Sequence, residues 1–245
     1  MIPRTLSHIW VGPLKPPRKW MQTWIDAHPG WRYQIYDNAY LESRPWRLRR
    51  YIDEFLRRRV YSGVADCMRY EILAEKGGFI AEADSVCINS VDDLFIEDKA
   101  YSVYEHEFLR GGLMTPFLAS PPGNAAVDHM IRMIESQDPE RMGEPYLSTG
   151  NYLVGKVVMM HPNDTVSLPS YTFNPTHFTG VKYSGEGKIY AEQYFSSGIG
   201  GYEKLGWWAR KKMRFERKKY ARPKSETVIQ EFSDEDLNLI RTRSC

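Results

Sequence analysis

The chain has 245 residues, 42% of them hydrophobic and 26% charged, with a formal net charge of +2. This composition is typical of a globular protein with one sizeable core. Three cysteines (Cys67, Cys87 and Cys245) are too few for a disulfide framework or a zinc site, and no apolar run approaches the ~18 residues that cross a bilayer. With no secretory leader predicted, we expect a cytoplasmic protein.

The N-terminal third alternates strand and helix signals. Residues 5–12 are apolar and read as a buried strand, 31–37 alternate at a period of two as a second strand, and Pro-Gly at 29–30 ends a helix over 17–27. An arginine-rich helix is predicted over 46–59. A further helix, capped by Ser62, runs to about Lys76 and stops at Gly77 and Gly78.

The rest of the chain continues this alternation. The pattern predicts strands over 79–88, 100–108, 117–123, 152–160 and 165–169, and a helix over 124–137. Interleaved helices and strands indicate an α/β layered fold with a largely parallel sheet. We expect one main domain over residues 1–200 and a basic helical extension, packed on or beside it, over 201–245.

Two carboxylates, Glu82 and Asp84, stand in the strand predicted over 79–88. Spaced i, i+2 on a strand, they share one face with their Cα atoms roughly 6–7 Å apart. Unpaired anions in a partly buried strand are costly, so a cation should offset them. Oxygen ligands select Mg²⁺ or Mn²⁺, although pairing with arginines at a strand end would satisfy the same charges.

The helix that precedes this strand carries Asp66 and Arg69 at an i, i+3 spacing on one face. Val64, Met68 and Ile72 form a separate apolar row that would pack on the sheet. The Asp66 and Arg69 pair is either a helix salt bridge or an acceptor and a forked donor presented to a polyhydroxylated ligand.

The blocks IPRTLSHIW (2–10), ADCMRYEILAEKGGFIAEAD (65–84) and LPSYTFNP (168–175) resemble the signature blocks of glycosyltransferase family 32, in order and spacing. That family of DXD-motif sugar transferases includes the yeast initiating mannosyltransferase and is related to the clostridial glucosylating toxins. The resemblance implies a GT-A fold with a Rossmann-like central sheet. It also implies a retaining transferase that uses a nucleotide sugar with Mn²⁺ or Mg²⁺.

By this resemblance, Trp10 next to Ile9 would stack on the donor base, and Asp66 and Arg69 would hold the sugar hydroxyls. Asp84 would ligate the metal, with Glu82 beside ribose, sugar and metal-bound water. The donor-binding residues implied are Ile9, Trp10, Asp66, Arg69, Glu82, Ala83, Asp84 and Gln193.

Three positions depart from the family pattern. Glu82 replaces the usual aspartate, and Ile80 replaces a frequent tyrosine. In the late block, Gln193 stands where a histidine is expected and no tryptophan follows Ser197, so Gln193, Ser196 or Ser197 would substitute in closing the site. Thr149, Gly150 and Asn151, where relatives present a Thr-Gly-Pro turn, and His177 are candidates for the acceptor site; a structural turn and a core histidine are the alternatives.

Basic residues gather in two blocks. Residues 44–59 carry seven arginines, and residues 204–224 carry ten Lys/Arg, a single acid and the pair Trp207 and Trp208. Either block suits a polyanionic partner or is a solvated helix face. The second suits the anionic inner face of a membrane and a lipid-linked acceptor; nucleic acid is disfavoured, because its aromatics do not interleave with the charges.

The leading hypothesis is a metal-dependent glycosyltransferase that uses a UDP-hexose, or less readily a GDP-sugar, to extend a saccharide or lipid-linked glycan. One alternative is a non-catalytic relative that binds a nucleotide sugar without transfer. A metal-dependent phosphodiester hydrolase is the third reading, disfavoured because no second cluster of His and Asp is evident in the sequence.

Overall fold

The computed structural model describes residues 1–109, 113–194 and 231–243. Its centre is a six-stranded sheet in the order β2-β1-β3-β6-β5-β7. Only β6 runs antiparallel to its neighbours in this sheet, so the predicted α/β fold with a mostly parallel sheet is confirmed. The bounds are β1 Thr5–Ile9, β2 Arg32–Tyr36, β3 Gly78–Ile80, β5 Ala100–Val103, β6 Ala119–Ser120 and β7 Thr165–Leu168.

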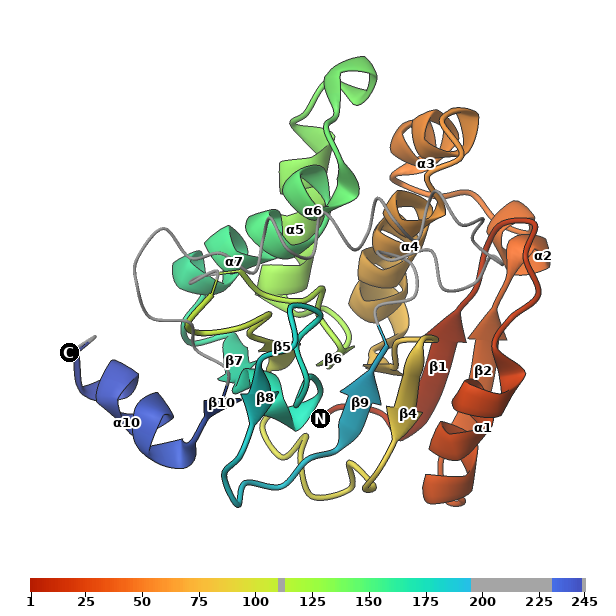
Figure 1. Cartoon of the computed structure of the whole chain (residues 1–245). Helices are drawn as coiled ribbons and strands as arrows, with labels where there is room; N and C mark the ends of the chain where they lie inside the picture. Colours follow the sequence, from red (N-terminus) through yellow and green to blue (C-terminus); the bar gives the residue numbers. More distant parts are fainter. Residues whose placement is uncertain (110–112, 195–230, 244–245) are drawn as a thin grey trace, which may run out of the picture.

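Helices cover both faces of the sheet. The bounds are α1 Arg18–Ala27, α2 Asn38–Glu42, α3 Arg49–Arg57, α4 Tyr61–Lys76, α5 Ala125–Glu135, α6 Pro145–Ser148, α7 Asn151–Met160 and α10 Asp234–Arg243, with short 3-10 turns at Pro139–Arg141 and Ser170–Thr172. In Figure 1, α3 to α7 lie together at the top, and α1 lies apart from them beside β4.

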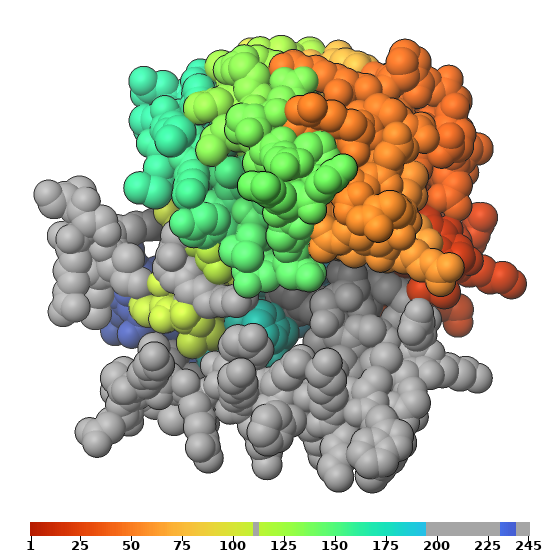
Figure 2. Space-filling model, turned by 90° about the horizontal axis from the view of Figure 1, so that it is seen from above, coloured from red at the N-terminus to blue at the C-terminus, as the bar shows by residue number. Residues whose placement is uncertain are grey.

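The layer of α3, α4, α5 and α7 buries one core against the sheet. Its fully buried members include Tyr51 and Phe55 from α3, Met68 from α4, Met130 from α5 and Val157 from α7. Seen from above in Figure 2, the orange surface of α3 lies beside the green segment near residue 140. A hydrogen bond of 2.9 Å from the Arg58 guanidinium to the Met142 carbonyl joins these two segments.

The opposite face of the sheet buries an aromatic core. Trp24 of α1 meets Phe79 of β3 edge-on at 5.3 Å between ring centroids and stacks on Phe173, which in turn stacks on Tyr190. A two-stranded antiparallel sheet of β4 (Ser85–Cys87) and β9 (Ala191–Gln193) borders this core. The layer therefore ties the chain after β3 to residues more than a hundred positions later.

Two predicted strands and one predicted helix cap are wrong. The strand expected over 79–88 is divided, because the chain leaves the main sheet after β3 and the Glu82 carbonyl accepts bonds from the backbone N–H (3.2 Å) and hydroxyl (2.7 Å) of Ser85. Residues 152–160 are helical in α7, since Leu153, Val154 and Val157 share one buried helical face. Ser62 does not cap α4. The helix begins at Tyr61 with Val60 at the N-cap position, and the residue before it, Arg59, has a left-handed backbone (φ 57°).

The C-terminal part that the structure describes returns to the main domain. β10 (Glu231–Phe232) pairs in parallel with β8 (Lys182–Tyr183), and Phe232 is buried beside Val181 and Leu237. The basic segment 204–224, with its predicted interfacial helix, lies outside the described residues. Among the described helices, none is long and apolar enough to cross a membrane.

The arginine block at 44–59 is largely paired inside the chain. Carboxylates lie within 4.0 Å of Arg44, Arg47, Arg49, Arg57 and Arg58. Arg50 lies over the ring of Tyr51 and donates to the Glu135 carbonyl at 3.0 Å. This block therefore holds α3 to its neighbours, and most of its charge is met within the chain.

Candidate functional site

The candidate site lies at the carboxyl ends of neighbouring parallel strands. Trp10 follows β1, and Glu82 and Asp84 follow β3; in register, Ser7 of β1 pairs with Ile80 of β3. The carboxyl edge of a parallel sheet is where α/β folds commonly bind ligands. The sheet thus brings residues near position 10 and near position 83 to one edge, under the middle of α4.

Arg69 is the best-anchored residue of the site. The residue is 4% exposed, and its side chain reaches from α4 and donates to the Ile80 carbonyl at 2.9 Å, the Phe117 carbonyl at 3.3 Å and the Glu82 carboxylate at 2.6 Å. The Nε of Arg69 is buried without a hydrogen-bond partner. Its ion-pair partner is therefore Glu82, across the Gly-Gly turn, rather than Asp66 on its own helix.

Asp66 is held by Thr149. The Thr149 hydroxyl, which is fully buried, donates to the Asp66 carboxylate at 2.8 Å. Burial raises the pKa of Asp66 to about 7, and the Thr149 hydrogen bond and the charge of Arg69 oppose this rise. Gly150 lies against the same carboxylate, since a Cβ there would stand 3.4 Å from the Asp66 oxygen. Two of the proposed acceptor residues are thus neighbours of a proposed sugar-binding residue.

Asn151 and His177 meet at a carboxylate that sequence reasoning missed. Glu105 is 6% exposed and accepts from the Asn151 amide at 2.9 Å, and the His177 ring nitrogen lies 3.6 Å from its other oxygen. Glu105 follows β5, which runs parallel to β3, so it lies at the same edge of the sheet. The available signal was an acid within the strand predicted over 100–108, which in the structure ends at Val103.

Asp84 is buried at the start of β4. It is 4% exposed, and the Gln193 amide donates to its carboxylate at 2.6 Å. The β4–β9 register places Ser85 opposite Gln193, and the Tyr194 N–H donates to the Asp84 carbonyl at 2.9 Å. The second sheet therefore brings the late-block residue Gln193 directly onto the turn that carries Glu82 and Asp84. Ser196 and Ser197 lie outside the described residues.

Glu82 and Asp84 form the carboxylate pair expected from the sequence, but on a turn rather than on one strand face. Burial raises the pKa of Glu82, the charge of Asp84 raises it further, and Arg69 lowers it. A bound cation would relieve the repulsion between the two carboxylates. Both also have partners inside the chain, so the alternative of pairing with an arginine holds for Glu82.

The two carboxylates fit a divalent cation by their donor chemistry. Mg²⁺ and Mn²⁺ prefer carboxylate oxygens and are commonly completed by substrate phosphates. Within residues 1–109, 113–194 and 231–243, no group of three or more His, Cys, Asp or Glu side chains is arranged to hold a metal ion. Glu82 and Asp84 would therefore need further oxygen ligands, such as those of a substrate, to complete the coordination of the ion.

The other residues predicted to bind the sugar donor differ in how exposed they are at this edge of the sheet. Trp10 is partly exposed and donates from its indole to the Leu14 carbonyl at 2.7 Å. Ile9 is buried in the core beneath α4, and Ala83 is 8% exposed between the two acids. Trp10 thus lies at the carboxyl end of β1, whereas the Ile9 side chain belongs to the core; the binding roles of these residues stay predictions.

Among known proteins, this chain is similar to solved structures but not to family models or curated sequences. No family model matches the chain, and no curated protein matches it by sequence. A solved structure described as "PaToxG Glycosyltransferase" superposes with a TM-score of 0.53 at 12% identity, covering 65% of this chain and 70% of that chain. The chain therefore has an α/β fold similar to that of a glycosyltransferase.

Proposed function

We propose that this chain is a glycosyltransferase that moves a hexose from a nucleotide sugar, with a UDP-sugar favoured, to a saccharide or lipid-linked glycan. The observation that supports this most is the meeting of Asp66, Arg69, Glu82 and Asp84 at the carboxyl edge of β1 and β3. The fold shared with a glycosyltransferase supports the same class of reaction.

In this proposal each residue has a distinct task. Asp66, oriented by Thr149, would accept from a sugar hydroxyl, and Arg69 would donate to another while fixing Glu82. Trp10 would stack on the base of the donor. Asp84 and Glu82 would hold Mn²⁺ or Mg²⁺, whose chemistry is to stabilise the negative charge of the departing diphosphate. Retention at the anomeric carbon is the stereochemistry we propose.

One observation favours a second candidate, a relative that binds a nucleotide sugar without transferring it. Glu82 is engaged by Arg69 and Asp84 by Gln193, so a cation has to compete with partners already in place. Such a protein would bind donor but release no diphosphate.

Release of free nucleoside diphosphate from a panel of UDP- and GDP-sugars, with Mn²⁺, Mg²⁺ or EDTA, tests the proposal. We expect slow, metal-dependent release from one donor because water intercepts the activated sugar. Asp84→Asn should abolish release, whereas Asp26→Asn, an exposed acid that contacts Gln22 on α1, should not. Donor binding without release from any sugar, with or without candidate acceptors, would favour the second candidate, and absence of donor binding would refute both.

A further inference from the structure

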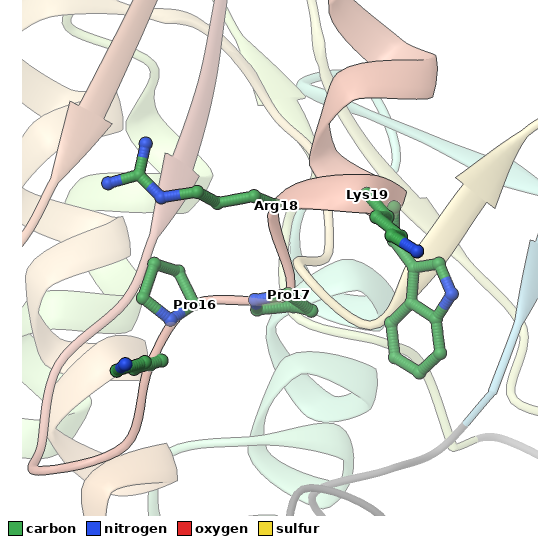
Figure 3. Close-up of a pocket in the computed structure, with 6 residues that line it drawn as sticks. Pro16, Pro17, Arg18 and Lys19 are labelled. Carbon is green, nitrogen blue, oxygen red and sulfur yellow. The ribbon is translucent and has the colours of Figure 1, made fainter.

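A pocket opens at the start of α1, outside the carboxylate site. Its lining is a single run of chain, Lys15 to Trp20. In Figure 3 the Arg18 side chain extends over Pro16 in one direction, and Lys19 lies beyond Pro17 in the other. Two prolines have no N–H to donate and fix the local backbone, so this wall of the pocket is stiff and apolar beneath three cationic side chains.

The charges at this pocket have no acidic partner among the residues that the structure describes. In the described part of the chain, no ion pair joins Lys15, Arg18 or Lys19 to an acid, and all three are exposed. The arginines of 44–59, in contrast, are largely paired with carboxylates. Three unpaired cations around one hollow attract an anion, and lysine and arginine bind phosphate or carboxylate through charge-assisted hydrogen bonds.

An aromatic pair connects the pocket to the candidate site. Trp20 stacks on Tyr194 with ring centroids 5.0 Å apart and planes 20° apart, and Tyr194 is 45% exposed. The Tyr194 N–H donates to the Asp84 carbonyl, so a single residue, Tyr194, links the pocket-lining Trp20 to a proposed metal ligand. An amphipathic aromatic surface next to cations suits a ligand with both an apolar ring face and a negative group.

We propose that this pocket binds a negatively charged saccharide, one that carries a phosphate or a carboxylate. Given the glycosyl-transfer function proposed above, this saccharide is part of the acceptor, positioned close to Asp84 but outside the donor residues. Lys15 and Lys19 supply the charge complementarity, and the exposed Tyr194, stacked on Trp20, supplies the aromatic surface for the sugar ring.

Saturation-transfer NMR without nucleotide tests the pocket with three probes: glucose 6-phosphate, methyl glucuronide and uncharged methyl glucoside. We expect signals from at least one anionic probe and not from methyl glucoside. The double variant Lys15→Glu/Lys19→Glu should weaken that binding about tenfold or more, which corresponds to about 1.4 kcal/mol. Lys156→Glu, an exposed lysine on α7 that lies over Tyr152, is the matched control and should bind as the native chain does.

The choice of anionic probe distinguishes phosphate from carboxylate recognition, and binding of either supports the proposal. Equal binding of all three probes, or no change in the double variant, would overturn it. Vesicles containing phosphatidylglycerol provide a further arm: retention on them that the double variant loses, without binding of any sugar, would assign the cations to a membrane surface instead. UDP binding, measured separately in the same variants, shows whether the donor site stands independently.

Discussion

Arg69 has to satisfy its donors within the protein, because only 4% of the residue is exposed. Two of its bonds go to backbone carbonyls, that of Ile80 at the end of β3 and that of Phe117 just before β6, and the third goes to Glu82. This anchoring fixes the guanidinium at the strand ends. Asp66, one helical turn earlier, is less constrained: it has the Thr149 hydroxyl and is only partly buried. Of the two residues, Asp66 is the one whose charge changes near neutral pH, because its pKa is about 7.

We expect Asp66→Asn to alter the pH dependence of stability. The pKa of Asp66 is raised from its ordinary value of 3.8 to about 7, so between these values the folded chain holds a proton that the unfolded chain has lost. The free energy of unfolding therefore falls as pH rises from about 4 to about 7. Asparagine still accepts from Thr149 but does not ionise, so the variant should gain about 1–2 kcal/mol on the native chain over this range, allowing for screening.

Urea unfolding at pH 4.5 and pH 8 measures this difference in the free energy of unfolding for the native chain, for Asp66→Asn and for Asp26→Asn. Asp26→Asn is the control, and its stability relative to the native chain should stay constant with pH. A difference between Asp66→Asn and the native chain that is the same at both pH values would show that Asp66 ionises normally in the folded state.

At the scale of elements, the segment α4–Gly77–Gly78–β3 forms one unit that carries most of the site. Both glycines lie in the left-handed region, with φ values of +62° and +99°. This turn sends the chain from the end of α4 directly into the sheet, so that Arg69 faces the end of β3. Because the helix, its apolar row, the two glycines and the acids are consecutive, this unit was predictable from the sequence.

Gly77→Ala should destabilise the protein much more than Gly123→Ala. A Cβ at Gly77 would stand 2.7 Å from the Ser120 carbonyl oxygen and 2.8 Å from Pro122, whereas at Gly123, with φ +72°, nothing lies within 4 Å. Both substitutions incur the left-handed cost of about 1–2 kcal/mol, and the clash at Gly77 should add about 1–3 kcal/mol. Denaturant unfolding of the two variants checks this; equal losses would mean that β6 moves away without cost.

Where partners lie far apart in the chain, sequence reasoning was incomplete. Gln193 was singled out by its place in the late block, but its bond to Asp84 spans 109 positions and depends on the pairing of β4 with β9. Glu105 was missed because its partners, Asn151 and His177, come from α7 and from a loop. The apolar run of α7 was read as a strand, because a short run of this kind has no distinct periodicity.

At the scale of the whole molecule, the site is assembled from both layers that cover the sheet. Asp66 and Arg69 come from the helices on one face, and Gln193 comes from the small sheet beside α1 on the other (Figure 1). The turn with Glu82 and Asp84 lies where these layers meet at the strand ends. A ligand that contacts this turn therefore meets residues from both layers, since Arg69 of α4 and Ser85 of β4 each bond to Glu82.

Binding of UDP with Mn²⁺ should accordingly stabilise the whole chain. At a concentration about 100 times its dissociation constant, a ligand that binds only the folded state adds about 2.7 kcal/mol, or about 5–10 °C in melting temperature for a protein of this size. Thermal unfolding with UDP and Mn²⁺ or with UDP and EDTA measures the shift in the native chain, in Asp84→Asn and in the control Asp26→Asn. The metal-dependent part of the shift in melting temperature should vanish in Asp84→Asn alone, because that variant removes a proposed ligand of the ion.

Amide exchange should show protection at residues 66–70, 80–86 and 191–194 together, and little change in α5, which lies away from the turn. An equal shift in EDTA, or protection limited to one of the three segments, would contradict a metal-dependent site built across both layers.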